Sequence, residues 1–307
     1  MISVLIPVKN GGEGVVRCVE AVREQAIDEE LEVIAVDSGS TDGSPGRMRR
    51  LGVFVHEIPA EEFSHGGTRN LLRELARGEV LVYLTDDALP AADDWLATLV
   101  AALRSRPDAA AAYGRQIPHA DASPSERYFL GFLYGTKGRV QRARSEDELT
   151  LETTMLSNAN AAYRRDVLDA HPFAEDLRWA EDQDFARRVL LEGKTIVYEP
   201  RAAVFHSHTY SISTAFHRFF DSGLAARHSY LSGGAPARRA LDSSLRRYAV
   251  GEMRWLWSEG HAAWIPYAVV YELAKLAGME LGIRGDLLPE WARARLGVEA
   301  HPRRRRA

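Results

Sequence analysis

Two adjacent aspartates and two closely spaced histidines much later in the chain are the side chains best suited to bind a divalent cation. Asp86 and Asp87 directly follow the apolar run Val80 to Leu84, and His206 and His208 lie two residues apart at the end of a later apolar run. Carboxylate oxygens are preferred ligands of Mg²⁺, which commonly bridges them to phosphate. A mixed set of carboxylate and imidazole suits Mg²⁺ or Mn²⁺ better than structural zinc. The alternatives are a helix N-cap for the aspartates and strand-end packing for the histidines.

A second acidic group, Glu181-Asp182-Gln183-Asp184, begins a predicted amphipathic helix from about Ala180 to Leu191. Acidic residues in a first helical turn complement the helix dipole, so a solvated turn is one explanation for them. The same dipole is expected to keep a catalytic carboxylate ionised, which is the state that a general base requires.

The sequence around these side chains predicts an α/β fold. Short apolar runs alternate with amphipathic stretches, which is the pattern of βαβ units and a mainly parallel sheet flanked by helices. Ligands bind beyond the carboxyl ends of parallel strands, where the acidic and histidine groups lie. Strands are predicted at Ser3 to Val8, Leu31 to Val36, Val53 to His56, Val80 to Leu84, Ala159 to Tyr163, Thr195 to Tyr198 and Ala203 to His206.

We divide the chain into a catalytic domain, residues 1–212, and a C-terminal helical extension, residues 213–300. The catalytic domain has a nucleotide-sugar-binding half, residues 1–114, and an acceptor and catalytic half, residues 115–212. Periodicity fades between Arg115 and Glu152, which predicts a partly helical lobe there. Residues 301–307 form a basic tail that we expect to be disordered.

Composition excludes several classes of protein. With 307 residues, 46% of them hydrophobic, the chain is neither disordered nor fibrous. Its net charge of -4 includes the tail arginines Arg303 to Arg306, so the body is more acidic still and no nucleic-acid partner is expected. A single cysteine favours a reducing, cytoplasmic location. Charged residues interrupt the apolar stretch Trp264 to Ile283, so we expect a protein that is either soluble or peripheral at the inner face of the cytoplasmic membrane.

The strand-end clusters together resemble the family 2 glycosyltransferases, whose fold is the GT-A arrangement of a nucleotide-binding α/β sheet. The resemblance covers about Ile2 to Tyr210. The motifs that carry it are Ser3-Val4-Leu5-Ile6-Pro7-Val8-Lys9-Asn10, Glu32-Val33-Ile34-Ala35-Val36-Asp37-Ser38-Gly39-Ser40-Thr41-Asp42-Gly43, Arg69-Asn70, Leu84-Thr85-Asp86-Asp87-Ala88 and Glu181-Asp182.

This resemblance implies roles for individual residues. Asp182 would be the catalytic base of an inverting transfer, supported by Glu181. The family metal motif has an aspartate at both ends of a D-x-D triplet, whereas Thr85 takes the first place here. The metal, Mg²⁺ or Mn²⁺, would therefore rest on Asp87 with His206, and less on His208. The implied residues of the nucleotide-sugar site are Pro7, Val8, Lys9, Asp37, Arg69 and Asp86.

Within the family, Phe63-Ser64-His65-Gly66 and the segment from Val204 to Ser211 are similar to the rhamnosyltransferase branch. The resemblance implies a dTDP-, UDP- or GDP-sugar donor and a saccharide or lipid-linked acceptor in cell-surface polysaccharide synthesis. Two alternatives are a sugar-1-phosphate nucleotidyltransferase and a non-catalytic sugar-nucleotide-binding protein. The aromatic C-terminal helices could contact a membrane, the catalytic domain or a second subunit.

Overall fold

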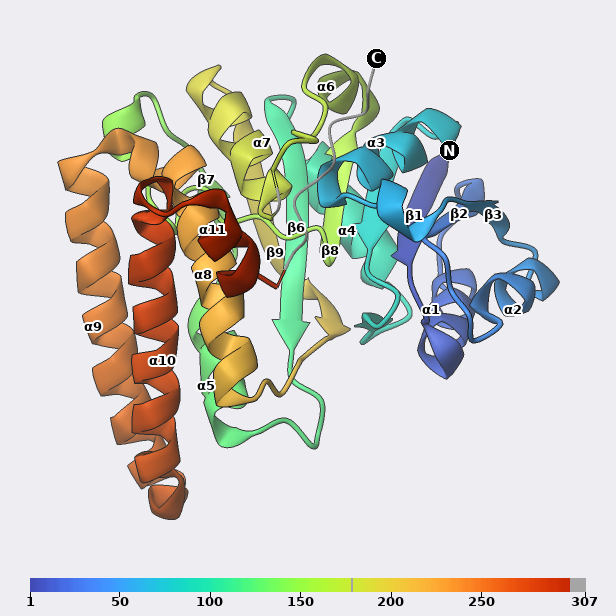
Figure 1. The fold of residues 1–307 in the computed structure, drawn as a ribbon. Coiled ribbons are helices and arrows are strands. Elements are labelled where there is room, and N and C mark those ends of the chain that lie inside the picture. The colour runs from blue at the N-terminus through green and yellow to red at the C-terminus, as the bar shows by residue number, and fades with distance from the viewer. Residues whose placement is uncertain (178, 299–307) are drawn as a thin grey trace.

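The computed structural model describes residues 1–177 and 179–298, which form an α/β fold around one mixed sheet (Figure 1). The strand order is β3-β2-β1-β4-β8-β6-β9-β5, and β7 pairs with β9. The C-terminal helices stand together beside one end of this sheet. The predicted disordered tail, residues 301–307, lies outside the described residues.

The parallel part of the sheet comes from the first third of the chain, as the alternating pattern predicts. Strand β1 pairs in parallel with β2 and β4, and β2 pairs in parallel with β3. These strands and the helices between them are β1 (Ile2–Val8), α1 (Gly12–Arg23), β2 (Leu31–Asp37), α2 (Ser44–Arg50), β3 (Phe54–Glu57), α3 (His65–Leu75) and β4 (Val80–Leu84). All four predicted strands in this part are confirmed within one residue at each end.

The second half of the sheet differs more from the prediction. Strand β8 (Asn160–Arg164) lies antiparallel between β4 and β6 (Ala109–Ile117), and β9 (Thr195–Phe205) runs parallel to β6. The prediction of two strands within β9 was wrong. The register against β6 shifts between Gly114 and Gln116, so the chain passes Pro200 in an irregular segment without ending the strand.

The other elements complete the layers around the sheet. Helix α7 (Glu181–Leu191) starts one residue after the predicted start and ends at the predicted Leu191. Gly193 follows it with a positive φ of 81°, a conformation that suits glycine. The other elements are β5 (Leu89–Pro90), α4 (Trp95–Arg104), α5 (Pro124–Leu133), β7 (Arg139–Gln141), α6 (Arg165–Ala170) and α7 (Glu181–Leu191). Short 3-10 turns occur at Ala60–Glu62, Glu146–Glu148, Tyr230–Gly233, Ala262–Trp264 and Gly285–Leu287.

The C-terminal region is helical, as predicted, and consists of α8 (Ile212–His228), α9 (Ala235–Ser258), α10 (Ile265–Ile283) and α11 (Glu290–Leu296). Helices α8 and α10 pack very closely. A Cβ on Gly278 would lie 2.2 Å from the Phe216 carbonyl oxygen, and one on Gly282 would lie 2.1 Å from that of Phe220. Among the described residues, no helix is both long and apolar enough to cross a bilayer.

Candidate active site

A cleft of about 610 Å³ opens at the carboxyl ends of β1 and β4 and at the end of β9. It is lined by every residue that the sequence predicts for the site except Asp37. These lining residues are Pro7, Val8, Lys9, Arg69, Asp86, Asp87, Glu181, Asp182, His206 and His208. Segments far apart in the sequence therefore meet where an α/β sheet binds its ligands.

Asp87 and both histidines converge on one point of this cleft. The Nε2 atoms of His206 and His208 are 3.0 Å apart, and they lie 3.4 Å and 3.5 Å from the two carboxylate oxygens of Asp87. One ligand atom from each residue falls within 4.8 Å of the others. Two imidazole nitrogens and a carboxylate oxygen facing each other form a donor set that fits a divalent cation such as Mn²⁺. His208 lies as close to Asp87 as His206 does.

Gln116 on β6 fixes the orientation of the His206 ring. Its Oε1 lies 2.7 Å from His206 Nδ1, while its Nε2 donates to the Tyr134 hydroxyl at 2.6 Å and to Ser157 Oγ at 2.9 Å. Because both amide hydrogens are used, Oε1 accepts the Nδ1 hydrogen and leaves the lone pair of His206 on Nε2. The sequence analysis missed Gln116, since it lies on a strand that was not predicted.

Asp182 occupies the other side of the cleft, in the first turn of α7. Its carboxylate accepts hydrogen bonds from the backbone amides of Asn158 at 3.1 Å and Gln183 at 2.8 Å. Burial, with the adjacent negative charge of Glu181, nevertheless raises the pKa of Asp182 to about 7. Desolvation thus outweighs the helix dipole, which was expected to favour the ionised form of this carboxylate. A group with a pKa near 7 is well matched to proton transfer at neutral pH.

A buried ion pair favours the ionised form of Glu181. Arg69 Nη1 lies 3.0 Å from Glu181 Oε1, and both side chains are less than a tenth exposed. The Asn158 side chain also donates to Glu181 at 2.9 Å. Although burial opposes ionisation, the Arg69 charge holds the pKa of Glu181 below its usual value. Ala180, just before this pair, has a φ of 62°, a strained conformation of the kind that clusters at functional sites.

The remaining predicted residues lie around the loops that follow β1, β2 and β4. Burial and the neighbouring charge of Asp87 raise the pKa of Asp86 to about 6. Asp37 is buried and does not line the cleft; its Oδ1 accepts from the amides of Gly39 at 3.1 Å and Ser40 at 2.9 Å. Its Oδ2 is buried with no hydrogen-bond partner among the described residues.

An apolar cavity of about 180 Å³ adjoins the Asp182 side of the cleft. It lies between α5, α8, α9 and α10, and shares Trp179, Ala180 and Gln183 with the cleft wall. Most of its lining is apolar, and Lys275 stands at the boundary between the two spaces. The Asp182 side of the cleft therefore adjoins a space that suits a partly apolar molecule.

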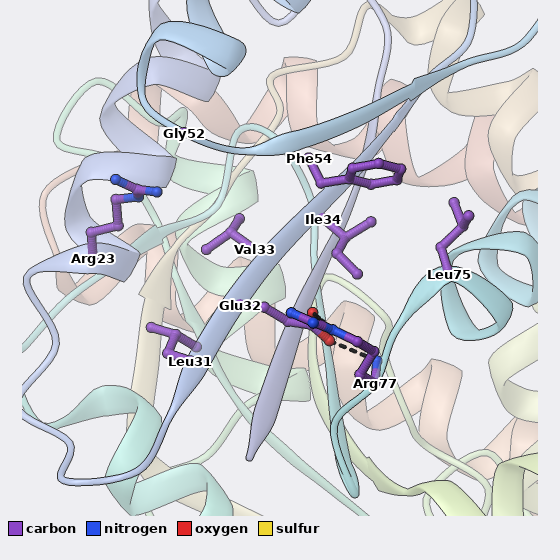
Figure 2. Close-up of a pocket in the computed structure, with 9 residues that line it drawn as sticks. All are labelled: Arg23, Leu31, Glu32, Val33, Ile34, Gly52, Phe54, Leu75 and Arg77. Carbon is purple, nitrogen blue, oxygen red and sulfur yellow. Dashed lines mark hydrogen bonds and ion pairs between the residues drawn. The ribbon is translucent and has the colours of Figure 1, made fainter.

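A second open cleft, of about 790 Å³, lies elsewhere on the sheet (Figure 2). It is bordered by Leu31 to Ile34 in the amino-terminal half of β2 and by Phe54. Arg77 Nε donates a hydrogen bond to Glu32 Oε2 at 3.0 Å beside it. It contains none of the predicted site residues and lies away from the carboxyl ends of the strands. The cleft that contains Asp87 and Asp182 is therefore the candidate active site.

Comparison with known proteins agrees with this geometry. The sequence model of "Glycosyl transferase family 2" matches residues 3–171. The O-antigen chain rhamnosyltransferase RfbN of Salmonella typhimurium is 32% identical over 94% of this chain and 91% of its own length. WbaN of Salmonella anatum, another O-antigen chain rhamnosyltransferase, is 33% identical over 84% of this chain and 81% of its own length.

Solved structures show the same fold. A mannosyltransferase from Pyrobaculum calidifontis, in complex with GDP-Man and Mn²⁺, superposes with a TM-score of 0.61 at 20% identity, over 92% of this chain and 86% of that one. TarS of S. aureus with UDP-GlcNAc gives a TM-score of 0.56 at 16% identity, over 92% of each chain. The predicted GT-A fold, with its C-terminal helices, is thereby confirmed.

Proposed function

Because the chain belongs to glycosyl transferase family 2, and is thus a glycosyltransferase that uses a nucleotide sugar, we propose that it transfers rhamnose to a growing cell-surface polysaccharide. Two relatives that match most of the chain are named as O-antigen chain rhamnosyltransferases. The observation that carries the proposal is the placement of Asp87, with its two histidines, and Asp182 on the walls of one cleft.

Asp87, His206 and His208 would hold Mn²⁺ or Mg²⁺, and the bound metal would neutralise charge that develops on the diphosphate leaving group. Gln116 keeps the Nε2 lone pair of His206 directed at this site. The donor's nucleotide would lie along Pro7, Val8 and Lys9, close to Asp86. Asp37 supports the neighbouring loop through Gly39 and Ser40.

Asp182 would accept the proton of the acceptor hydroxyl. As the O–H bond breaks, that oxygen forms a bond to the anomeric carbon, and the bond from this carbon to the diphosphate oxygen breaks. The leaving group departs on the face opposite the attack, so the anomeric configuration inverts. Glu181, held ionised by Arg69, keeps a negative charge beside Asp182 and so favours uptake of the proton.

The acceptor would enter from the side of the apolar cavity. The cavity's lining by α5, α8, α9 and α10 favours an acceptor with an apolar portion, such as a lipid-linked saccharide, over a free sugar. Lys275 at the boundary is surrounded by aromatic rings, with its Nζ 2.8 Å from Glu272 Oε1.

A donor panel tests this function directly. Purified protein is incubated with dTDP-rhamnose, UDP-sugars or GDP-sugars and Mn²⁺, and release of the nucleoside diphosphate is measured with and without a lipid-linked saccharide. Acceptor-dependent release from dTDP-rhamnose is expected. Release of pyrophosphate from a nucleoside triphosphate and a sugar phosphate would instead indicate a nucleotidyltransferase, and binding without turnover a non-catalytic protein.

A further inference from the structure

Helices α9 and α10 lie side by side as an antiparallel pair, here called the C-terminal hairpin (Figure 1), and the Arg238–Glu280 ion pair joins them. On the inner side, Tyr248 of α9 packs against Tyr128 and Phe132 of α5. Gly278 of α10 packs against α8. Since α5 and α8 cover the same side of the hairpin, the sides turned away from them face solvent together.

The outer side of α10 is apolar along its length. Helical spacing places Val270, Leu273, Ala277 and Leu281 in one row, and all four are exposed. Leu273 is 60% exposed, Val270 52% and Leu281 40%. Soluble proteins rarely expose contiguous apolar surface of this kind without a partner for it.

The outer side of α9 is basic. Arg239, Arg246 and Arg254 recur at helical spacing along it and are all exposed. None of the three forms an ion pair with another residue of the described chain. Trp257, 73% exposed, ends this row at the tip of the hairpin. Two acidic residues, Asp242 of α9 and Glu280 of α10, are both paired with Arg238.

We infer that the outer side of the C-terminal hairpin docks on the surface of a membrane that contains anionic phospholipid. The apolar side chains would contact the acyl chains of such a membrane, and the unpaired guanidinium groups beside them would contact the lipid phosphates. An exposed Trp at the end of the row suits the interface between them. A second copy of the chain is less well matched, because a symmetric contact would place each arginine row against either the other arginine row or the apolar row of α10.

Flotation with lipid vesicles tests this inference without reference to transfer activity. The probes are vesicles of phosphatidylcholine alone and vesicles that also contain about 30 mol% phosphatidylglycerol. The full chain should float with the anionic vesicles and much less with the neutral ones, and added salt should weaken its binding. Absence of binding to both would overturn the inference and leave the proposed glycosyl transfer unaffected.

Two variants separate the contributions of charge and apolar surface. Replacing Arg239, Arg246 and Arg254 together by Ala should lower the vesicle partition coefficient on the order of 100-fold. Leu273→Asp should lower it by about 10-fold or more, because an apolar side chain is replaced by a charge. All of these side chains are exposed, so the melting temperature should stay close to that of the unaltered protein.

Matched controls come from the opposite end of the sheet. Replacing the exposed Arg17, Arg23 and Arg50 by Ala changes the net charge equally, and Phe54→Asp alters an exposed apolar side chain away from the hairpin. These controls should bind vesicles normally. Equal loss in controls and hairpin variants would overturn the inference. So would light scattering that shows a dimer dispersed by Leu273→Asp, because a second copy would then cover this surface.

Discussion

The proposed role of Asp182 as the base predicts a specific dependence of activity on pH. With a pKa of about 7, this carboxylate is protonated in acid and able to accept a proton above neutrality. The value of kcat/KM should therefore rise about tenfold per pH unit up to about pH 7 and then level off. At about pH 5 it should lie on the order of 100-fold below the plateau. Release of nucleoside diphosphate at saturating Mn²⁺ measures this profile.

Asp182→Asn removes the base and retains the shape of the side chain. Turnover should fall by roughly 10²- to 10⁴-fold, while affinity for the donor changes little. Asp184→Asn is the matched control, because Asp184 lies in the same helical turn but is 2.9 Å from Arg188 in an ion pair. Near-normal turnover in Asp182→Asn, or a rate that does not change with pH in the unaltered protein, would refute the assignment.

Asp182→Asn should also stabilise the folded protein above neutral pH. Because the folded-state pKa of Asp182 is raised from 3.8 to about 7, stability contributed by this group is present below about pH 4 and is lost as pH rises to about 7. This difference between the two pKa values corresponds to at most ~4 kcal/mol of folding free energy. Asn cannot accept from both backbone amides that now bond Asp182, which costs ~1–3 kcal/mol.

The net effect of Asp182→Asn at about pH 8 is therefore a stabilisation of ~1–3 kcal/mol, which raises Tm by several degrees. At about pH 4, where Asp182 is itself neutral, only the cost of the lost hydrogen bond remains, so the variant should unfold at the same temperature or a lower one. Thermal unfolding of both proteins at the two pH values measures it. A lower Tm for the variant at pH 8 would show that the buried carboxylate is not destabilising.

Three further predictions concern the metal site and the helical region. Asp87→Ala should weaken Mn²⁺-dependent binding of nucleoside diphosphate by about 10-fold or more in calorimetry; binding that is independent of Mn²⁺ in both proteins would contradict the assignment. Gln116→Leu should lower Mn²⁺ affinity roughly 10- to 100-fold, since His206 loses the bond that orients it; unchanged affinity in a folded variant would exclude this role. Gly278→Ala should reduce the free energy of unfolding by ~2 kcal/mol or more in urea, because its Cβ meets α8, whereas Ala277→Ser on the exposed side should have little effect.

The fold could be predicted from sequence wherever strands are rich in branched apolar residues. Strand β4, Val80–Leu84, is buried throughout and was predicted with its observed bounds. Strand β6 begins with four alanines, Ala109 to Ala112, which have little preference for strands and take that conformation only because β8 and β9 flank them. Its position depends on long-range pairing, which local periodicity does not report.

The candidate site was predictable where side chains directly follow strands or open a helix. Asp87, His206 and Asp182 follow that rule, and the structure brings them to one cleft. Gln116 and Asn158 did not stand out, because amides on a strand and in a loop have no distinctive spacing. Their roles depend on which atoms they meet in the folded chain.

The neighbouring carboxylates of Glu181 and Asp182 show why helix position alone could not assign protonation. Both lie in the first turn of α7, so the helix dipole acts on them alike. Of these two carboxylates, it is Glu181 that pairs with Arg69, at 3.0 Å, and this ion pair favours its ionised form. That fixed negative charge, together with burial, raises the proton affinity of Asp182. Two acidic residues adjacent in sequence thus acquire different chemistry from one arginine more than a hundred residues away, and the pair can position one charge while it moves one proton.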